Sequence, residues 1–176
     1  CVSRSFSSEI YEVKELQEQI ANFASTMAEK LRKQHSVTSE IVVFAYTNRF
    51  KDDAPQAYAN ALVSFVTPTA DQRTIITEAV HAMQKSFKSG YGYKKAGVIA
   101  TKIIDEKCVM HSLFEDTEAI EREHKITSAL DAINSTFGKG TIKLAVQGSG
   151  KIKTSSESQS PHYTTLWSDI PNVTEK

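Results

Sequence analysis

The sequence predicts an α+β fold of the split βαβ type, with two helices on one face of a four-stranded antiparallel sheet. Segments 13–31 and 75–87 repeat apolar residues at intervals of three and four, which is typical of amphipathic helices. Four short runs rich in β-branched and aromatic residues predict strands; these runs are 2–6, 41–46, 61–66 and 94–104. The resulting order, strand, helix, strand, strand, helix, strand, is the βαββαβ pattern.

Local signals support both helices. The first has glutamates near its start and Lys30, Arg32 and Lys33 near its end, which suits the helix dipole. Thr69 and Gln72 form a capping-box pattern before the second helix, and Gly90 follows that helix as a C′ glycine would. These signals place the helix ends beside predicted strands.

A change in composition after Phe114 predicts a second region. Acidic residues at 115–123 begin a third helix, and Gly138 and Gly140 end it. We expect one more short strand at 141–146 and then a mostly extended tail. The chain is therefore divided into residues 1–116, the sheet domain with its terminal peptide, and residues 117–176.

Length and composition indicate a globular protein. The chain has 176 residues and 21 basic against 21 acidic side chains, so its formal net charge is zero. Neither a bilayer-spanning apolar run nor a secretory signal is recognised, and we expect no membrane association. Cys1 and Cys108 form no disulfide framework, which favours a reducing cytoplasm. Cys1 would suit a lipoprotein, but the strand-like residues after it favour a domain cut from a longer chain.

The sequence offers little support for catalysis. The histidines are scattered, and the turn Gly148-Ser149-Gly150-Lys151 lacks both the earlier glycine and the hydroxyl residue of a phosphate-binding loop. Adjacent acidic residues point in different directions and rarely hold one ion. We therefore assign no catalytic residue, no metal site and no cofactor to this chain.

Positive charge is concentrated in one segment, although the chain as a whole is neutral. Between Ala79 and Ile104 there are five lysines and no acidic residue. Arg4, Lys94, Lys95 and Lys102 fall on strands that we expect to lie at the outside of the sheet, and Ser3 and Ser5 add hydroxyl donors. These side chains suit phosphate contacts. Lysines that protect an edge strand from aggregation explain Lys94 and Lys95 equally well.

Two further segments suit partner binding. Leu113 and Phe114 follow a polar linker, and they either pack back under the sheet, which spacing favours, or enter a pocket on another protein. Tyr163 and Trp167, the only tryptophan, lie in a tail segment that we expect to dock on something.

Six motifs occur in the order seen in UmuC proteins, and the resemblance covers essentially the whole chain. The motifs are Ser3-Arg4-Ser5-Phe6, Ala28-Glu29-Lys30-Leu31-Arg32, Thr47-Asn48-Arg49-Phe50, Thr67-Pro68-Thr69, Gly90-Tyr91-Gly92-Tyr93-Lys94-Lys95-Ala96-Gly97-Val98 and Ser160-Pro161-His162-Tyr163-Thr164-Thr165. The chain thus resembles the C-terminal part of UmuC, the Y-family polymerase subunit of bacterial DNA polymerase V.

The resemblance implies a function for each region. Residues 1–116 look like a little-finger domain that grips primer-template DNA, and the matching DNA-facing residues are Ser3, Arg4, Ser5, Arg49, Lys94 and Lys95. The sliding-clamp peptide matches Met110, His111, Ser112, Leu113 and Phe114. Residues 117–176 resemble a docking region for UmuD′, and RecA is a further implied partner. The palm that binds catalytic Mg²⁺ would precede Cys1, so this chain is expected to bind DNA in SOS translesion synthesis without polymerising.

Several residues depart from the family pattern, and they bear on clamp binding and on the tail. Met110 stands where the clamp motif normally has a glutamine, so the amide hydrogen bond is lost and clamp affinity should fall. His162 and Leu166 stand where related chains often have arginine. Two rival functions are a protein-interaction module whose lysines only solubilise it, and a small ferredoxin-like enzyme acting on a phosphorylated substrate.

Overall fold

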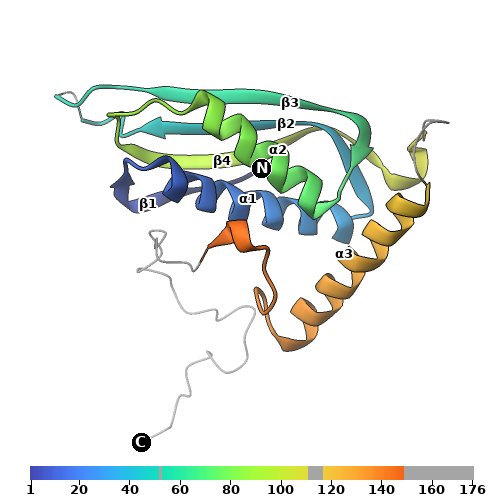
Figure 1. Cartoon of the computed structure of the whole chain (residues 1–176). Helices are drawn as coiled ribbons and strands as arrows, with labels where there is room; N and C mark the ends of the chain where they lie inside the picture. Colours follow the sequence, from blue (N-terminus) through green and yellow to red (C-terminus); the bar gives the residue numbers. More distant parts are fainter. Residues whose placement is uncertain (52, 111–116, 149–176) are drawn as a thin grey trace, which may run out of the picture.

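The computed structural model describes residues 1–51, 53–110 and 117–148. In this part of the chain, four strands form one antiparallel sheet in the order β1-β4-β2-β3. Helices α1 and α2 lie side by side against one face of it (Figure 1). The elements are β1 (Val2–Ile10), α1 (Val13–Lys33), β2 (Ser36–Thr47), β3 (Tyr58–Thr69), α2 (Gln72–Ser86), β4 (Tyr93–Asp105) and α3 (Thr117–Phe137), with short 3₁₀ turns η1 (Glu106–Cys108) and η2 (Ala145–Gln147). The predicted βαββαβ fold is confirmed.

The hydrophobic core lies between the two helices and the sheet. Leu16 and Ile20 of α1 and Ile41 and Val98 of the sheet are fully buried. Each such side chain contributes about 1.5–3 kcal/mol when it leaves water. The apolar stripe predicted from the sequence is therefore the surface that fixes α1 on the sheet, and none of the described helices covers the opposite sheet face.

The position of β4 corrects one expectation. We expected Lys94 and Lys95 on an outer strand, but β4 pairs with β1 on one side and with β2 on the other. The edges of the sheet are β1 and β3. In a split βαβ fold the last strand enters between the first two, which periodicity along the chain does not reveal. Protection of an edge strand is thus the wrong explanation for the lysines of β4.

Both ends of α2 also differ from the prediction. Its N-cap is Asp71, whose carboxylate accepts a hydrogen bond of 2.8 Å from the backbone N–H of Thr74. Thr69 instead accepts from the backbone N–H of Asp71, so the predicted capping box is wrong. Asp71 therefore caps the helix N-terminus, the role that was predicted for Thr69. Gly90 has a φ of +87° but lies in the turn beyond the C-cap Phe87, and so it is not a C′ glycine.

The strand predicted at 141–146 is absent from the described structure, where this segment is a turn followed by η2. The Asn134 side chain donates to the carbonyl of Ile142 at 3.1 Å and accepts from its N–H at 3.0 Å. These bonds occupy backbone groups that a strand would use for pairing. Gly138, with a φ of +105°, follows the last residue of α3, in agreement with the prediction.

Candidate nucleic-acid interface

The sheet face opposite α1 and α2 is the candidate site, and we call it the open sheet face. Side chains alternate along a strand, and directly paired residues point to the same side. Ile41, Val43 and Val98 are buried under the helices. The residues before and after them along each strand, and the residues paired with those, therefore lie on the open sheet face. These are Ser3, Ser5, Val42, Phe44, Tyr46, Tyr58, Asn60, Leu62, Lys95, Gly97 and Ile99.

One row of this face crosses all four strands. Ser5 pairs with Lys95, Lys95 with Tyr46, and Tyr46 with Tyr58. The row thus combines a hydroxyl, an ammonium and two phenols. Hydroxyl and ammonium groups are common donors to phosphate oxygens, and aromatic rings add flat apolar surface. Two of the predicted site residues, Ser5 and Lys95, are brought together here.

Two cations gather around one aromatic ring at the hairpin end of the face. The guanidinium carbon of Arg49 lies 4.8 Å from the centroid of the Tyr46 ring, and Lys95 Nζ lies 5.9 Å from it. The Phe44 and Tyr46 rings are nearly parallel, with centroids 6.1 Å apart. The Tyr46 ring attracts both positive charges by cation–π interaction, about 0.5–1 kcal/mol each at an exposed site. Arg49, predicted as a DNA contact, therefore lies next to Lys95.

Lys94 has a different environment from Lys95. Pairing between β1 and β4 shifts register between Ser5 and Ile10, and that between β2 and β4 shifts beyond Tyr46. Such bulges re-aim side chains. Lys94 Nζ donates a 2.9 Å hydrogen bond to the backbone carbonyl of Ser7. Its charge therefore lies along the β1 edge, beside the open sheet face.

Arg4 falls on the other side of the sheet from its neighbours. Its partner in the ladder is Ala96, which is buried under the helices, whereas Ser3 pairs with Gly97 on the open face. Arg4 is exposed at the edge strand, and its Nη1 donates to the carbonyl of Ser3 at 3.1 Å. Three consecutive strand residues cannot share one face. Arg4 as a DNA contact stays a prediction.

Other lysines are neutralised by acidic neighbours. Lys102 Nζ lies 2.5 Å from a carboxylate oxygen of Glu40. Lys51 Nζ lies 2.7 Å from a carboxylate oxygen of Glu9, and the Tyr11 hydroxyl donates to the other at 2.9 Å. Hydrogen bonds from Lys51 and Tyr11 lower the pKa of Glu9, and the same contacts raise the pKa of Lys51 and of Tyr11. This cluster ties the end of β1 to the β2–β3 loop, and sequence spacing gave no signal of it.

An apolar row lies further along the open sheet face. Ile99, Val42 and Leu62 form this row across β4, β2 and β3, and Leu62 is 62% exposed. Beyond it Glu40 pairs with Ser64 and Thr101, and Val66 on β3 is fully exposed. The face therefore carries exposed apolar side chains on β3 at a distance from its basic and aromatic end.

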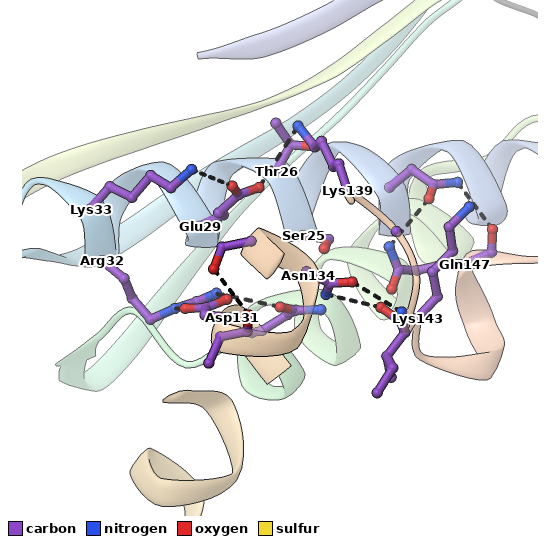
Figure 2. A pocket seen from close by; sticks show the side chains of 16 residues that line it. Ser25, Thr26, Glu29, Arg32, Lys33, Asp131, Asn134, Lys139, Lys143 and Gln147 are labelled. Atoms are coloured by element: carbon purple, nitrogen blue, oxygen red, sulfur yellow. Dashed lines mark hydrogen bonds and ion pairs between the residues drawn. The ribbon is translucent and has the colours of Figure 1, made fainter. Parts of the chain in front are cut away.

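A polar cleft of about 720 Å³ lies between α1 and α3, where the second region meets the sheet domain (Figure 2). Arg32 of α1 grips both carboxylate oxygens of Asp131 on α3, at 2.6 and 2.7 Å. One carboxylate oxygen of Glu29 lies 2.7 Å from Lys33 Nζ, and the other lies 3.7 Å from Lys139 Nζ. The hydrogen bond from Lys33 and the charge of Lys139 lower the pKa of Glu29. The hydrogen bond to Glu29 raises the pKa of Lys33.

The same face of α3 continues this polar contact. Thr127 donates to Asp71 at 3.1 Å, and Glu123 pairs with Arg73 at 2.7 Å. Ile126 and Phe137 of α3 contribute little to this contact, because they are 42% and 74% exposed. The bidentate contact between Arg32 and Asp131 fixes orientation as well as distance.

The clamp and tail predictions lie almost wholly outside the described residues. Met110 is described and is 89% exposed, whereas His111, Ser112, Leu113 and Phe114 are outside the described ranges. Tyr163 and Trp167 are outside them as well. Among the described residues, no helix has the length and apolar character needed to cross a membrane, and no three His, Cys, Asp or Glu side chains group as a metal site would require.

Comparison with known proteins identifies both regions. Residues 1–113 match the impB/mucB/samB family C-terminal domain, and residues 124–173 match a domain of unknown function (DUF4113). The chain is 34% identical to UmuC of Salmonella typhimurium over 97% of its own length and 41% of that protein. It is 32% identical to ImpB of the same organism over 96% of its length and 40% of that protein.

The chain therefore spans about two fifths of these relatives. A solved complex of the β-clamp processivity factor with the little finger domain of PolIV aligns with 66% of this chain and 92% of the solved chain, at 13% identity and a TM-score of 0.41. The resemblance to UmuC found in the sequence is confirmed by the match over nearly the whole chain. The chain belongs to the impB/mucB/samB family, and its residues 1–113 are that family's C-terminal domain.

Proposed function

We propose that this chain is the DNA-gripping and partner-docking part of a Y-family translesion DNA polymerase of the UmuC type. Family membership supports the assignment, as does a 24% identity over 80% of this chain to DNA polymerase IV of Desulfatibacillum aliphaticivorans. Polymerisation, the Mg²⁺ that it needs and the choice of lesion belong to the remainder of the parent protein. Action in the SOS response of the bacterial cytoplasm is part of this proposal.

The observation that carries the proposal is the row Ser5, Lys95, Tyr46 and Tyr58 with Arg49 beside it. Lys95 and Arg49 supply positive charge, and Ser3 and Ser5 supply hydroxyl donors on the same open surface. Contacts of these kinds go to phosphate oxygens and position a protein on DNA without reading its sequence. Binding that ignores sequence suits a polymerase, which must move along any template.

The proposed partners are a sliding clamp, a UmuD′-like subunit and RecA. Clamp binding rests on the peptide 110–114, in which Leu113 and Phe114 form the apolar anchor. Replacing both with alanine should abolish capture of the chain by immobilised clamp and leave its DNA affinity unchanged. Capture at the wild-type level would overturn the clamp assignment. We propose UmuD′ docking for the tail around Tyr163 and Trp167.

A second candidate function has its own observation. Leu62 and Val66 expose apolar side chains on the edge strand β3, and such side chains make no favourable contact with phosphates. Exposed apolar side chains of this kind are typical of protein contacts. A protein-interaction module would use this part of β3 and leave the basic end of the open sheet face as a solubilising surface.

Single lysine variants separate the two functions. Lys95→Ala should weaken binding to all duplex sequences alike and lower the slope of log affinity against log salt by about 1. Lys95→Arg should retain most of the affinity, because the charge stays. Lys102→Ala is the matched control, since Lys102 is already paired with Glu40, and it should have little effect. Equal affinities for Lys95→Ala and the wild type would contradict DNA binding by this face.

A further inference from the structure

A second binding surface adjoins the basic end of the open sheet face. Arg49, Gln56, Ala57 and Tyr58 line an open cavity of about 390 Å³ where the β2–β3 hairpin meets the sheet. None of the four is acidic. This volume lies within the range of roughly 300–1,000 Å³ that is common for ligand pockets. The inference drawn from it rests on the proposed function.

The aromatic wall of this cavity is Tyr58. Its ring centroid lies 6.4 Å from that of Tyr46, the two planes are tilted by 41°, and Tyr58 is 48% exposed. Arg49 already lies over the Tyr46 ring. Of the two rings, Tyr58 is therefore the one that lines the cavity. The guanidinium of Arg49 lines the same cavity.

The cavity is held in shape by Gln56. Its Nε2 donates to three backbone carbonyls of the loop, those of Asn48, Lys51 and Ala54, at 3.0 to 3.2 Å. Its Oε1 accepts from the Thr47 hydroxyl at 2.7 Å. The amide of Gln56 is therefore occupied within the protein. It stabilises the loop that carries Arg49 and has no group left to read the edge of a base.

This chemistry selects a particular ligand. A flat π surface next to a guanidinium, without an acid and with the Gln56 amide already occupied, suits a base stacked on Tyr58 with its phosphate toward Arg49. Bases within a duplex are stacked on each other and cannot offer a face. We propose that this cavity binds one unpaired nucleotide of single-stranded DNA, without preference for the base, beside the duplex-gripping row.

Three variants of Tyr58 and its surroundings test the site by fluorescence anisotropy, with a labelled thymidine oligonucleotide and a labelled blunt duplex. Tyr58→Leu should weaken binding of the oligonucleotide about tenfold, because stacking on an aromatic ring contributes roughly that factor or more. Tyr58→Phe should bind like the wild type, since the ring remains. Leu62→Ala, two residues further along the same strand, should not matter. The wild type, Tyr58→Phe and Leu62→Ala should bind the blunt duplex equally. Tyr58→Leu removes one ring of the duplex-gripping row but keeps Lys95 and Arg49, so it should lose less affinity for the blunt duplex than for the oligonucleotide. An unchanged circular dichroism spectrum shows that this variant is folded.

A second probe removes the bases and leaves the phosphates. An oligonucleotide of abasic units should bind the wild type about as weakly as the thymidine oligonucleotide binds Tyr58→Leu. Wild-type-level binding of the thymidine oligonucleotide by Tyr58→Leu, or equal binding of both probes, would overturn the nucleotide site. If duplex binding persists in that case, the proposed function stands. Absence of binding to duplex and oligonucleotide alike would overturn both.

Discussion

The ring of Phe44 lies across the backbone of Gly97 on the neighbouring strand, where a Cβ atom would stand 2.8 Å from Phe44 Cζ. The same Cβ would lie within 3 Å of the Ser3 side chain and the Val2 carbonyl. Only glycine leaves room for this arrangement, which brings the aromatic surface of β2 close to β4 and β1. Phe44 is only 9% exposed as a result, although it lies on the open sheet face.

Gly97→Ala should therefore lower the free energy of unfolding by about 1–3 kcal/mol, the usual cost of overpacking. Chemical denaturation measures this loss. In a Phe44→Leu background the cost should be smaller, because one of the three close contacts is relieved. The same cost in both backgrounds would show that Phe44 and Gly97 are not coupled.

Arg4 and Lys95 should differ in their effect on DNA binding. Arg4 pairs with Ala96 on the helix side of the sheet, whereas Lys95 lies on the open face. Arg4→Ala is expected to reduce duplex affinity less than Lys95→Ala does, in anisotropy titrations at equal salt. A larger loss for Arg4→Ala would mean that the duplex follows the β1 edge.

Asp131 should hold α3 against the sheet domain. Charge-assisted hydrogen bonds contribute about 1.5–3 kcal/mol, and Asp131 makes two of them to Arg32. Asp131→Ala should speed amide hydrogen exchange along α3 and leave exchange in the sheet nearly unchanged. Glu121→Ala is the control, because its pairing with Lys125 stays within α3 and is exposed. Unchanged amide exchange rates along α3 in Asp131→Ala would show that the Arg32–Asp131 contact does not hold this helix in place.

The folded chain should lose stability in acid through Glu29. Its pKa in the folded protein lies below the usual value, owing to Lys33 and Lys139. The charged carboxylate therefore adds stability above the unfolded pKa, about 4.3, and this is lost as the pH falls through the folded value. The difference in Tm between the wild type and Glu29→Gln should be largest near neutral pH, and it should disappear once the pH has fallen below the folded pKa of Glu29. A difference that is constant across this range would exclude Glu29 as the titrating group.

The sequence predicted the order and type of the main elements because apolar periodicity is a local property of each helix and strand. It did not predict that β4 is an inner strand, since strand order depends on contacts between segments far apart in the chain. For the same reason it grouped Arg4 with Ser3 and Ser5, and it did not separate Lys94 from Lys95 across a bulge. Gln56, Tyr58 and Asp131 carried no motif. Their roles come from partners that lie between 2 and 99 positions away.

The most direct test of the central claim is the salt dependence of binding between this chain and a labelled primer-template duplex, followed by anisotropy from 50 to 200 mM salt. If about four phosphate contacts form at the basic end of the open sheet face, affinity should fall roughly a hundredfold over this range. Affinity that is absent at 50 mM salt, or that does not change with salt, would contradict DNA gripping by this face.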